Sequence, residues 1–121
     1  MPDPEREFVW ALDAIEARRA AAGGAYEEFL SVPDLSAGLY VLDAGAVDGQ
    51  SPHGEDEIYY VVSGRGRITV RGATRDVVPG SIVFVAAQEP HTFHDITERL
   101  VLLVAFGPAE GSRAWEAPSP A

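Results

Sequence analysis

Glycine and proline interrupt this chain at short, regular intervals, and this spacing limits what the chain can fold into. The sequence holds 12 Gly and 9 Pro in 121 residues. From Gly24 onwards, turn-forming residues recur roughly every 6–12 residues, and the segments between them are rich in β-branched and aromatic side chains. Such segments are too short for long helices. The pattern predicts an all-β sandwich or barrel of about eight or nine short strands.

The expected strands lie at residues 8–12, 26–32, 39–42, 57–63, 67–71, 74–78, 81–85, 91–96 and 100–106. The strand from Glu57 to Ser63 is apolar on both faces and is expected to end at Gly64. We therefore expect every side chain of this strand to be buried or half-buried. Residues 67–78 read as a hairpin around Gly72-Ala73.

One short helix is expected before the strands. Asp13 suits its N-cap and Gly23 suits the residue after its last turn. Leu12, Ile15 and Arg19 would share a face that packs on the body or on a dimer edge. We expect three parts: an N-terminal arm with this helix and a strand (1–35), a barrel (36–106) and a C-terminal tail (107–121).

The charge balance excludes several classes of partner. The formal net charge is −10 and the chain contains no Lys, so nucleic acid and anionic lipid are not expected ligands. The longest strongly apolar run, residues 100–106, is far shorter than the roughly 20 residues of a membrane helix. The N-terminal residues lack the pattern of a signal peptide, so a cytoplasmic protein is expected. Because Cys is absent, disulfides and thiolate sites are excluded.

Three histidines and one acidic segment could carry chemistry. His53, Glu55 and Glu57 share parity, so they would share a face if this stretch is extended. A carboxylate at Glu57, at the start of an apolar strand, is costly unless it is paired or binds a cation. His91 follows another apolar strand, and His94 points to the opposite face. Two imidazoles and a carboxylate on barrel strands suit a divalent metal, whereas hydrogen-bonded histidines and a solvated acidic turn are the alternative.

The sequence around these residues resembles the cupin superfamily, in its small single-domain bacterial form. Cupins carry the motifs G-x5-H-x-H-x(3,4)-E-x6-G and G-x5-P-x-G-x2-H-x3-N. Glu57 and Gly64 fit the end of the first motif, and His53 falls on its second His. Gly80 and His91 fit the opening Gly and the metal-binding His of the second motif. The resemblance covers residues 36–106 and implies a double-stranded β-helix, or jelly-roll barrel, whose ligands project into its centre.

Four motif positions depart from the family pattern, and they fall on Ser51, Ala86, Gln88 and Asp95. Ser51 replaces the first His, so the implied metal ligands are His53, Glu57 and His91. Gln50 or Glu55 could replace the missing ligand, or the metal could have been lost. Without thiolates, Fe, Mn, Co, Ni and Zn all suit such a site.

The resemblance implies a small metal-dependent enzyme acting on a small organic molecule, by oxygenase, isomerase or decarboxylase-like chemistry. Glu55 is the candidate general acid or base, and Tyr59 and Phe93 are expected to line the substrate pocket. A non-catalytic binding module and a dimeric scaffold with a vestigial site are the alternatives. A homodimer is expected, because small barrels leave edge strands to cover.

Overall fold

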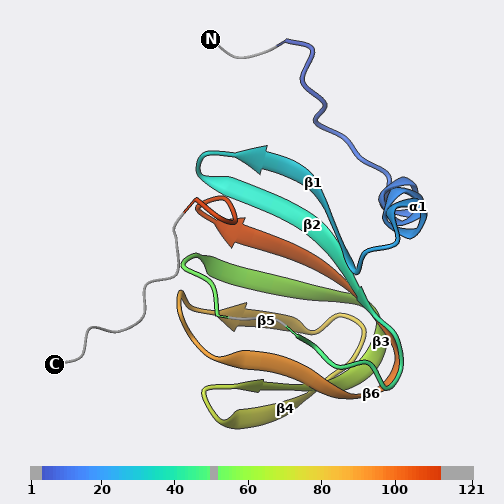
Figure 1. The fold of residues 1–121 in the computed structure, drawn as a ribbon, viewed down its shortest axis with the longest axis vertical. Coiled ribbons are helices and arrows are strands. Elements are labelled where there is room, and N and C mark those ends of the chain that lie inside the picture. The colour runs from blue at the N-terminus through green and yellow to red at the C-terminus, as the bar shows by residue number, and fades with distance from the viewer. Residues whose placement is uncertain (1–3, 50–51, 113–121) are drawn as a thin grey trace, which may run out of the picture.

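One helix and six strands make up the described chain, which comprises residues 4–49 and 52–112 of a computed structural model. In chain order the elements are α1 (Leu12–Ala22), β1 (Tyr26–Val32), β2 (Leu35–Leu42), β3 (Asp56–Val70), β4 (Ala73–Val77), β5 (Ile82–Val85) and β6 (His91–Gly107). All strand pairs are antiparallel, in the order β1-β2-β6-β3-β4, with β5 on β3 (Figure 1). The prediction of an all-β jelly-roll barrel with one short helix is confirmed.

Two long, bent strands take the place of four expected short ones. The expected strands at 57–63 and 67–71 are halves of β3, and those at 91–96 and 100–106 are halves of β6. The β3–β6 ladder shifts register repeatedly between Val61 and Arg67, so the sheet bends there without breaking. Gly64 is therefore a bend inside β3, and the prediction that it ends a strand is wrong.

The N-cap of the helix lies two residues before the expected one. Ala11 is the N-cap and offers no side-chain hydrogen bond, whereas Asp13 lies in the first turn, where its charge favours the positive helix end. Gly23, with φ of 84°, ends the helix as predicted. Residues 8–11 form no strand. Of the expected helix face, Ile15 is buried and Leu12 is exposed.

Two apolar clusters lie on opposite faces of the sheet. The larger fills the inside of the barrel, where Tyr59, Phe93, Leu100 and Leu102 are almost fully buried. The smaller joins Ile15 of α1 to Leu39 and Val41 on the outer face of β2. Helix α1 therefore covers one part of the outer face, and no other helix or strand of residues 4–49 and 52–112 packs on that face (Figure 1).

The first half of β3 has one buried and one exposed face. Glu57, Tyr59 and Val61 point inward and are buried, whereas Ile58 and Tyr60 are 45% and 44% exposed. Ser63 is also exposed, so the prediction that this segment is buried or half-buried on both faces holds fully only for the inward face. Both faces are apolar in sequence, so the pattern could not show which face the barrel closes on.

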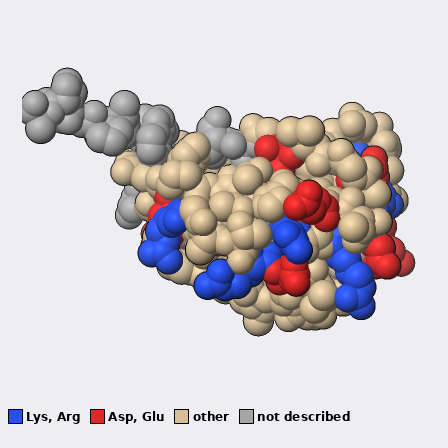
Figure 2. Space-filling model, turned by 90° about the horizontal axis from the view of Figure 1, so that it is seen from below, with Lys and Arg blue, Asp and Glu red and all other residues tan. Residues whose placement is uncertain are grey.

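Charges of both signs are mixed over the face seen in Figure 2. Arginines of β3 pair with acids on neighbouring strands, Arg65 with Glu98 and Arg67 with Asp76. An open groove of about 540 Å³ runs between these pairs, and the two arginines that line it are already paired with acidic side chains. No helix of the described residues has the length and apolarity needed to cross a membrane.

Candidate metal centre and ligand cavity

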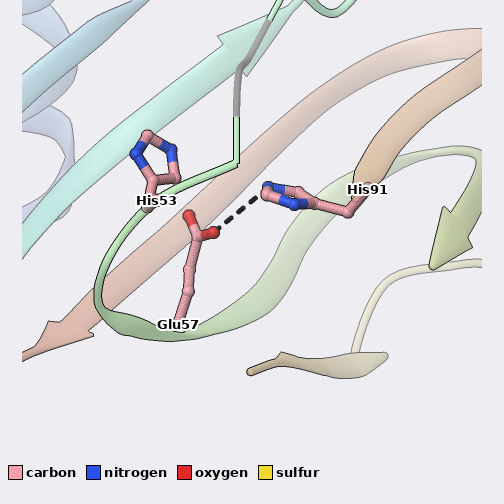
Figure 3. Close-up of side chains that lie close together, drawn as sticks. All are labelled: His53, Glu57 and His91. Atoms are coloured by element: carbon pink, nitrogen blue, oxygen red, sulfur yellow. Dashed lines mark ion pairs between the residues drawn. The ribbon is translucent and has the colours of Figure 1, made fainter. Parts of the chain in front are cut away.

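Three side chains from separate parts of the chain converge inside the barrel (Figure 3). Glu57 lies near the start of β3, His91 begins β6, and His53 lies in the irregular segment before β3. One ligand atom from each lies within 4.8 Å of the others. Among the described residues, this group of His and carboxylate side chains is the one compact enough to share a metal ion.

His91 directs its Nε2 at the Glu57 carboxylate. Its Nδ1 lies 2.9 Å from the backbone carbonyl oxygen of Glu89, and only an N–H can pair with that oxygen. The neutral ring therefore carries its proton on Nδ1 and points the lone pair of Nε2 inward. This carbonyl contact fixes the ring in the way that partners of metal-binding imidazoles do.

A neutral His91 ring would turn the lone pair of Nε2 towards the Glu57 carboxylate. His91 Nε2 and Glu57 Oε1 lie 3.3 Å apart, and both side chains are about 1% exposed. Within the described part of the chain, neither atom, nor Glu57 Oε2, has a well-aligned hydrogen-bond partner. Such a pair needs a shared cation, either a proton or a metal. Burial lowers the pKa of His91, but the Glu57 carboxylate and the Glu89 carbonyl outweigh it and raise the pKa overall.

Loop contacts hold His53 beside this pair. Its backbone carbonyl accepts a hydrogen bond of 2.6 Å from the amide of Gln88, in the turn that precedes His91. Its ring stacks edge-on against Phe106, with centroids 5.2 Å apart, and lies 6.0 Å from the ring of His91. The donor set of two imidazoles and one carboxylate thus fits a divalent ion of the Fe, Mn, Co, Ni or Zn type.

A cavity of about 150 Å³ opens beside the three side chains. Its lining residues are Tyr26, Tyr40, His53, Glu57, Tyr59, Val104, Phe106 and Glu110. Tyr59 therefore lies where the sequence predicts. Phe93 is not among the lining residues; it packs edge-on behind Tyr59, with centroids 4.9 Å apart.

A buried acid, Asp48, braces the wall of the cavity. One of its oxygens accepts a 2.8 Å hydrogen bond from the Tyr40 hydroxyl, and the other accepts a 2.9 Å bond from the amide of Phe93. Burial, together with the hydrogen bond to Asp48, raises the pKa of Tyr40. Sequence reasoning missed this pair, because nothing in the spacing of Tyr40 and Asp48 shows that β2 and the following loop fold onto one wall.

The structure does not bring Glu55 into the group. Glu55 is buried, and its Oε1 accepts a hydrogen bond of 3.1 Å from the amide of Gly111. Residues 54–55 form a bend, so the shared parity with Glu57 does not put the two side chains on one face. The other proposed replacement ligand, Gln50, and the motif position Ser51 lie outside the described residues.

Glu110, in the C-terminal segment, also lines the cavity, and sequence reasoning missed this residue. Its amide donates a 2.8 Å hydrogen bond to Ser36, which folds this segment back over the start of β2. Burial raises the pKa of Glu110, even though His53 acts in the opposite direction. Little in the sequence of residues 107–112 signals this contact.

A comparison with protein-family profiles matches residues 38–106 to the Cupin domain family. The chain belongs to the cupin family. This cupin is 54% identical over 102 residues to the uncharacterized protein SCO3923 of Streptomyces coelicolor, which covers 84% of this chain and 97% of that protein. The family resemblance expected from the two motifs is therefore confirmed.

Two solved structures show the same barrel. The KdgF protein of a Halomonas species is 25% identical to this cupin, with a TM-score of 0.65 over 71% of this chain and 79% of that chain. An RmlC-like cupin of Shewanella frigidimarina is 22% identical, with a TM-score of 0.63 over 72% of this chain and 80% of that chain. The latter likeness concerns the fold alone.

Proposed function

We propose that this cupin binds one divalent metal ion through His53, Glu57 and His91 and uses it to hold and activate a small organic molecule. The observation that carries the proposal is the buried pair of Glu57 Oε1 and His91 Nε2, 3.3 Å apart, neither of which has a well-aligned hydrogen-bond partner among the described residues. An ion at this position would supply a Lewis acid that polarises an oxygen atom of the ligand. Isomerase and decarboxylase-like reactions use that chemistry, whereas oxygenase-like reactions would also need a redox-active metal that binds O₂.

The chain's own residues support this role in three ways. Tyr59, Val104 and Phe106 form an apolar wall that excludes water from the ligand. Three protein ligands leave coordination positions free for the ligand's oxygen. Glu110 is better placed than Glu55 to exchange a proton with the ligand, because Glu110 lines the cavity and Glu55 faces the Gly111 amide.

Metal content of the purified protein tests the proposal. Protein prepared without chelator should contain about one divalent ion per chain. His53→Ala and His91→Ala should each lower that content strongly, because each removes one of three ligands.

His94→Ala provides the matched control. His94 hydrogen-bonds Thr69 through Nε2 at 2.7 Å and lies outside the group of three, so its loss should leave the metal content unchanged. Equal and negligible metal in the wild type and both site variants, even after incubation with excess Fe(II), Mn(II), Co(II), Ni(II) or Zn(II), would overturn the proposal.

A further inference from the structure

The hydroxyl of Tyr26 is buried at the cavity and has no hydrogen-bond partner in residues 4–49 and 52–112. Leaving a buried hydroxyl unpaired costs about 1–3 kcal/mol, so such groups call for a specific explanation. The neighbouring Tyr40 lines the same cavity, but its hydroxyl is bonded to Asp48 at 2.8 Å. The two tyrosines therefore differ: Tyr40 is part of the wall, and Tyr26 offers a free donor to the cavity.

The backbone of β2 is shaped to admit the Tyr26 ring. Tyr26 pairs with Tyr40 across the β1–β2 ladder, and Gly38 lies diagonally opposite. A Cβ atom at Gly38 would overlap Cζ, Cε1 and the hydroxyl of Tyr26. The ring also packs edge-on against Tyr40, with centroids 6.3 Å apart. The missing side chain at Gly38 thus gives the phenol its position, which indicates a built contact point and not a stray buried hydroxyl.

We infer that Tyr26 recognises the ligand by donating a hydrogen bond to one of its oxygens, while a second oxygen of the same ligand faces the group His53, Glu57 and His91. This inference rests on the proposed function, because it takes the metal as the partner of the second oxygen. Tyr26 and Glu57 line the same cavity, so a single small molecule can reach both.

The cavity limits the ligand to a compact molecule. Its volume of about 150 Å³ corresponds to about five water molecules at about 30 Å³ each. Its walls are mainly apolar. The polar groups on them include the Tyr26 hydroxyl, the His53 ring and the carboxylates of Glu57 and Glu110. A small 2-oxo or 2-hydroxy acid fits these features: it has few atoms, carries neighbouring oxygens for two contacts, and its negative charge suits a divalent ion that Glu57 only half neutralises.

Two probes on the Co(II)-loaded protein test the inference, with the visible absorption of the cobalt as readout. Pyruvate offers two oxygen sites, whereas azide binds a metal through one end and needs no contact with Tyr26. Tyr26→Phe should weaken pyruvate binding roughly ten- to hundredfold, as expected for a lost hydrogen bond to a charged group. The same variant should bind Co(II) and azide as the wild type does.

Tyr60→Phe is the matched control, because it removes a hydroxyl from the exposed outer face of the same sheet. It should change neither affinity. Unaltered pyruvate affinity in Tyr26→Phe would overturn the role of Tyr26 and leave the metal site standing. Azide binding without pyruvate binding in the wild type would overturn the assigned ligand class. Failure to bind any of Fe(II), Mn(II), Co(II), Ni(II) and Zn(II) would refute the proposed function and this inference with it.

Discussion

At the scale of single residues, the cavity depends on what is absent at position 38. The Tyr26 ring occupies the space of a Gly38 side chain, so the two residues cannot change independently. The ring in turn brings a free hydroxyl next to Glu57 and His53. A glycine inside a strand lowers the stability of the fold, because the unfolded chain is more flexible at that position. At position 38 the glycine also leaves the space that the Tyr26 ring occupies.

This dependence predicts non-additive stability effects. Gly38→Ala should lower the free energy of unfolding by about 2 kcal/mol or more, because the new methyl group displaces the Tyr26 ring. In a Tyr26→Ala background the same change should cost roughly 1–2 kcal/mol less. Urea unfolding of the two single variants and the double variant measures the coupling. Additive costs would contradict the observed overlap.

Alkaline pH tests the buried tyrosines. Burial raises the pKa of Tyr26 and Tyr40, with the nearby carboxylates adding to the effect at both and the hydrogen bond to Asp48 adding at Tyr40. In the unfolded chain tyrosine ionises near pH 10. The unfolded state therefore loses protons first, so the free energy of unfolding is at its full value below about pH 10 and falls as the pH rises towards the folded-state pKa values.

The chain has no Lys and no Cys, so tyrosine is the side chain that titrates between about pH 9 and pH 11. Unfolding free energies at these two pH values should differ clearly in the wild type. Tyr40→Phe should reduce the difference. An equal free energy of unfolding at both pH values in the wild type would refute the assignment.

At the scale of elements, the fold depends on β3, because this strand continues through the bend at Gly64. Gly64 has φ of 95°, and a Cβ atom there would overlap the backbone carbonyl of Arg99 on β6. The two long strands can cross here only without a side chain. This bend lets one half of β3 pair with β5 and the other half with β4.

Gly64→Ala should therefore destabilise the fold by more than about 3 kcal/mol, from backbone strain together with steric overlap. Gly72→Ala is the matched control, since Gly72 also has positive φ, 78°, but has open space around its Cβ position. That change should cost about 1 kcal/mol. Thermal and urea unfolding measure both, and equal losses would contradict the role assigned to Gly64.

Local patterns predict some parts of this molecule and fail for others. His53, Glu57 and His91 are found by motif spacing, because ligand positions follow the strand starts. Tyr26 depends on the register of β1 against β2, and Glu110 depends on how the C-terminal segment folds back on Ser36. The positions of Tyr26 and Glu110 depend on residues far away in the sequence, so no local pattern could predict them.

At the scale of the whole molecule, the described residues leave an apolar outer face of β5, β3 and β6 uncovered. We define this outer patch by Ile58, Tyr60, Ile82, Phe84, Leu103 and Ala105. Ile82 and Phe84 are 67% and 60% exposed. The N-terminal arm that leads away from the body carries a second exposed apolar segment, with Phe8 at 80% (Figure 1). Apolar surface of this extent marks interaction sites.

We expect a second copy of this chain to cover the outer patch. The patch carries no charge, so two molecules with a net charge of −10 can meet there without pairing like charges. Light scattering should show a dimer for the wild type and a monomer for Phe84→Glu. Val47→Glu, in an exposed loop, should stay dimeric. A monomeric wild type would contradict the expectation.

The direct test of the metal centre is an anomalous difference map from crystals of the metal-loaded protein, recorded at the absorption edge of the bound metal. The account predicts one peak within about 2.0–2.2 Å of a nitrogen of His53, Nε2 of His91 and an oxygen of Glu57. No peak there, or a peak only at surface groups such as His94 and Asp95, would contradict it.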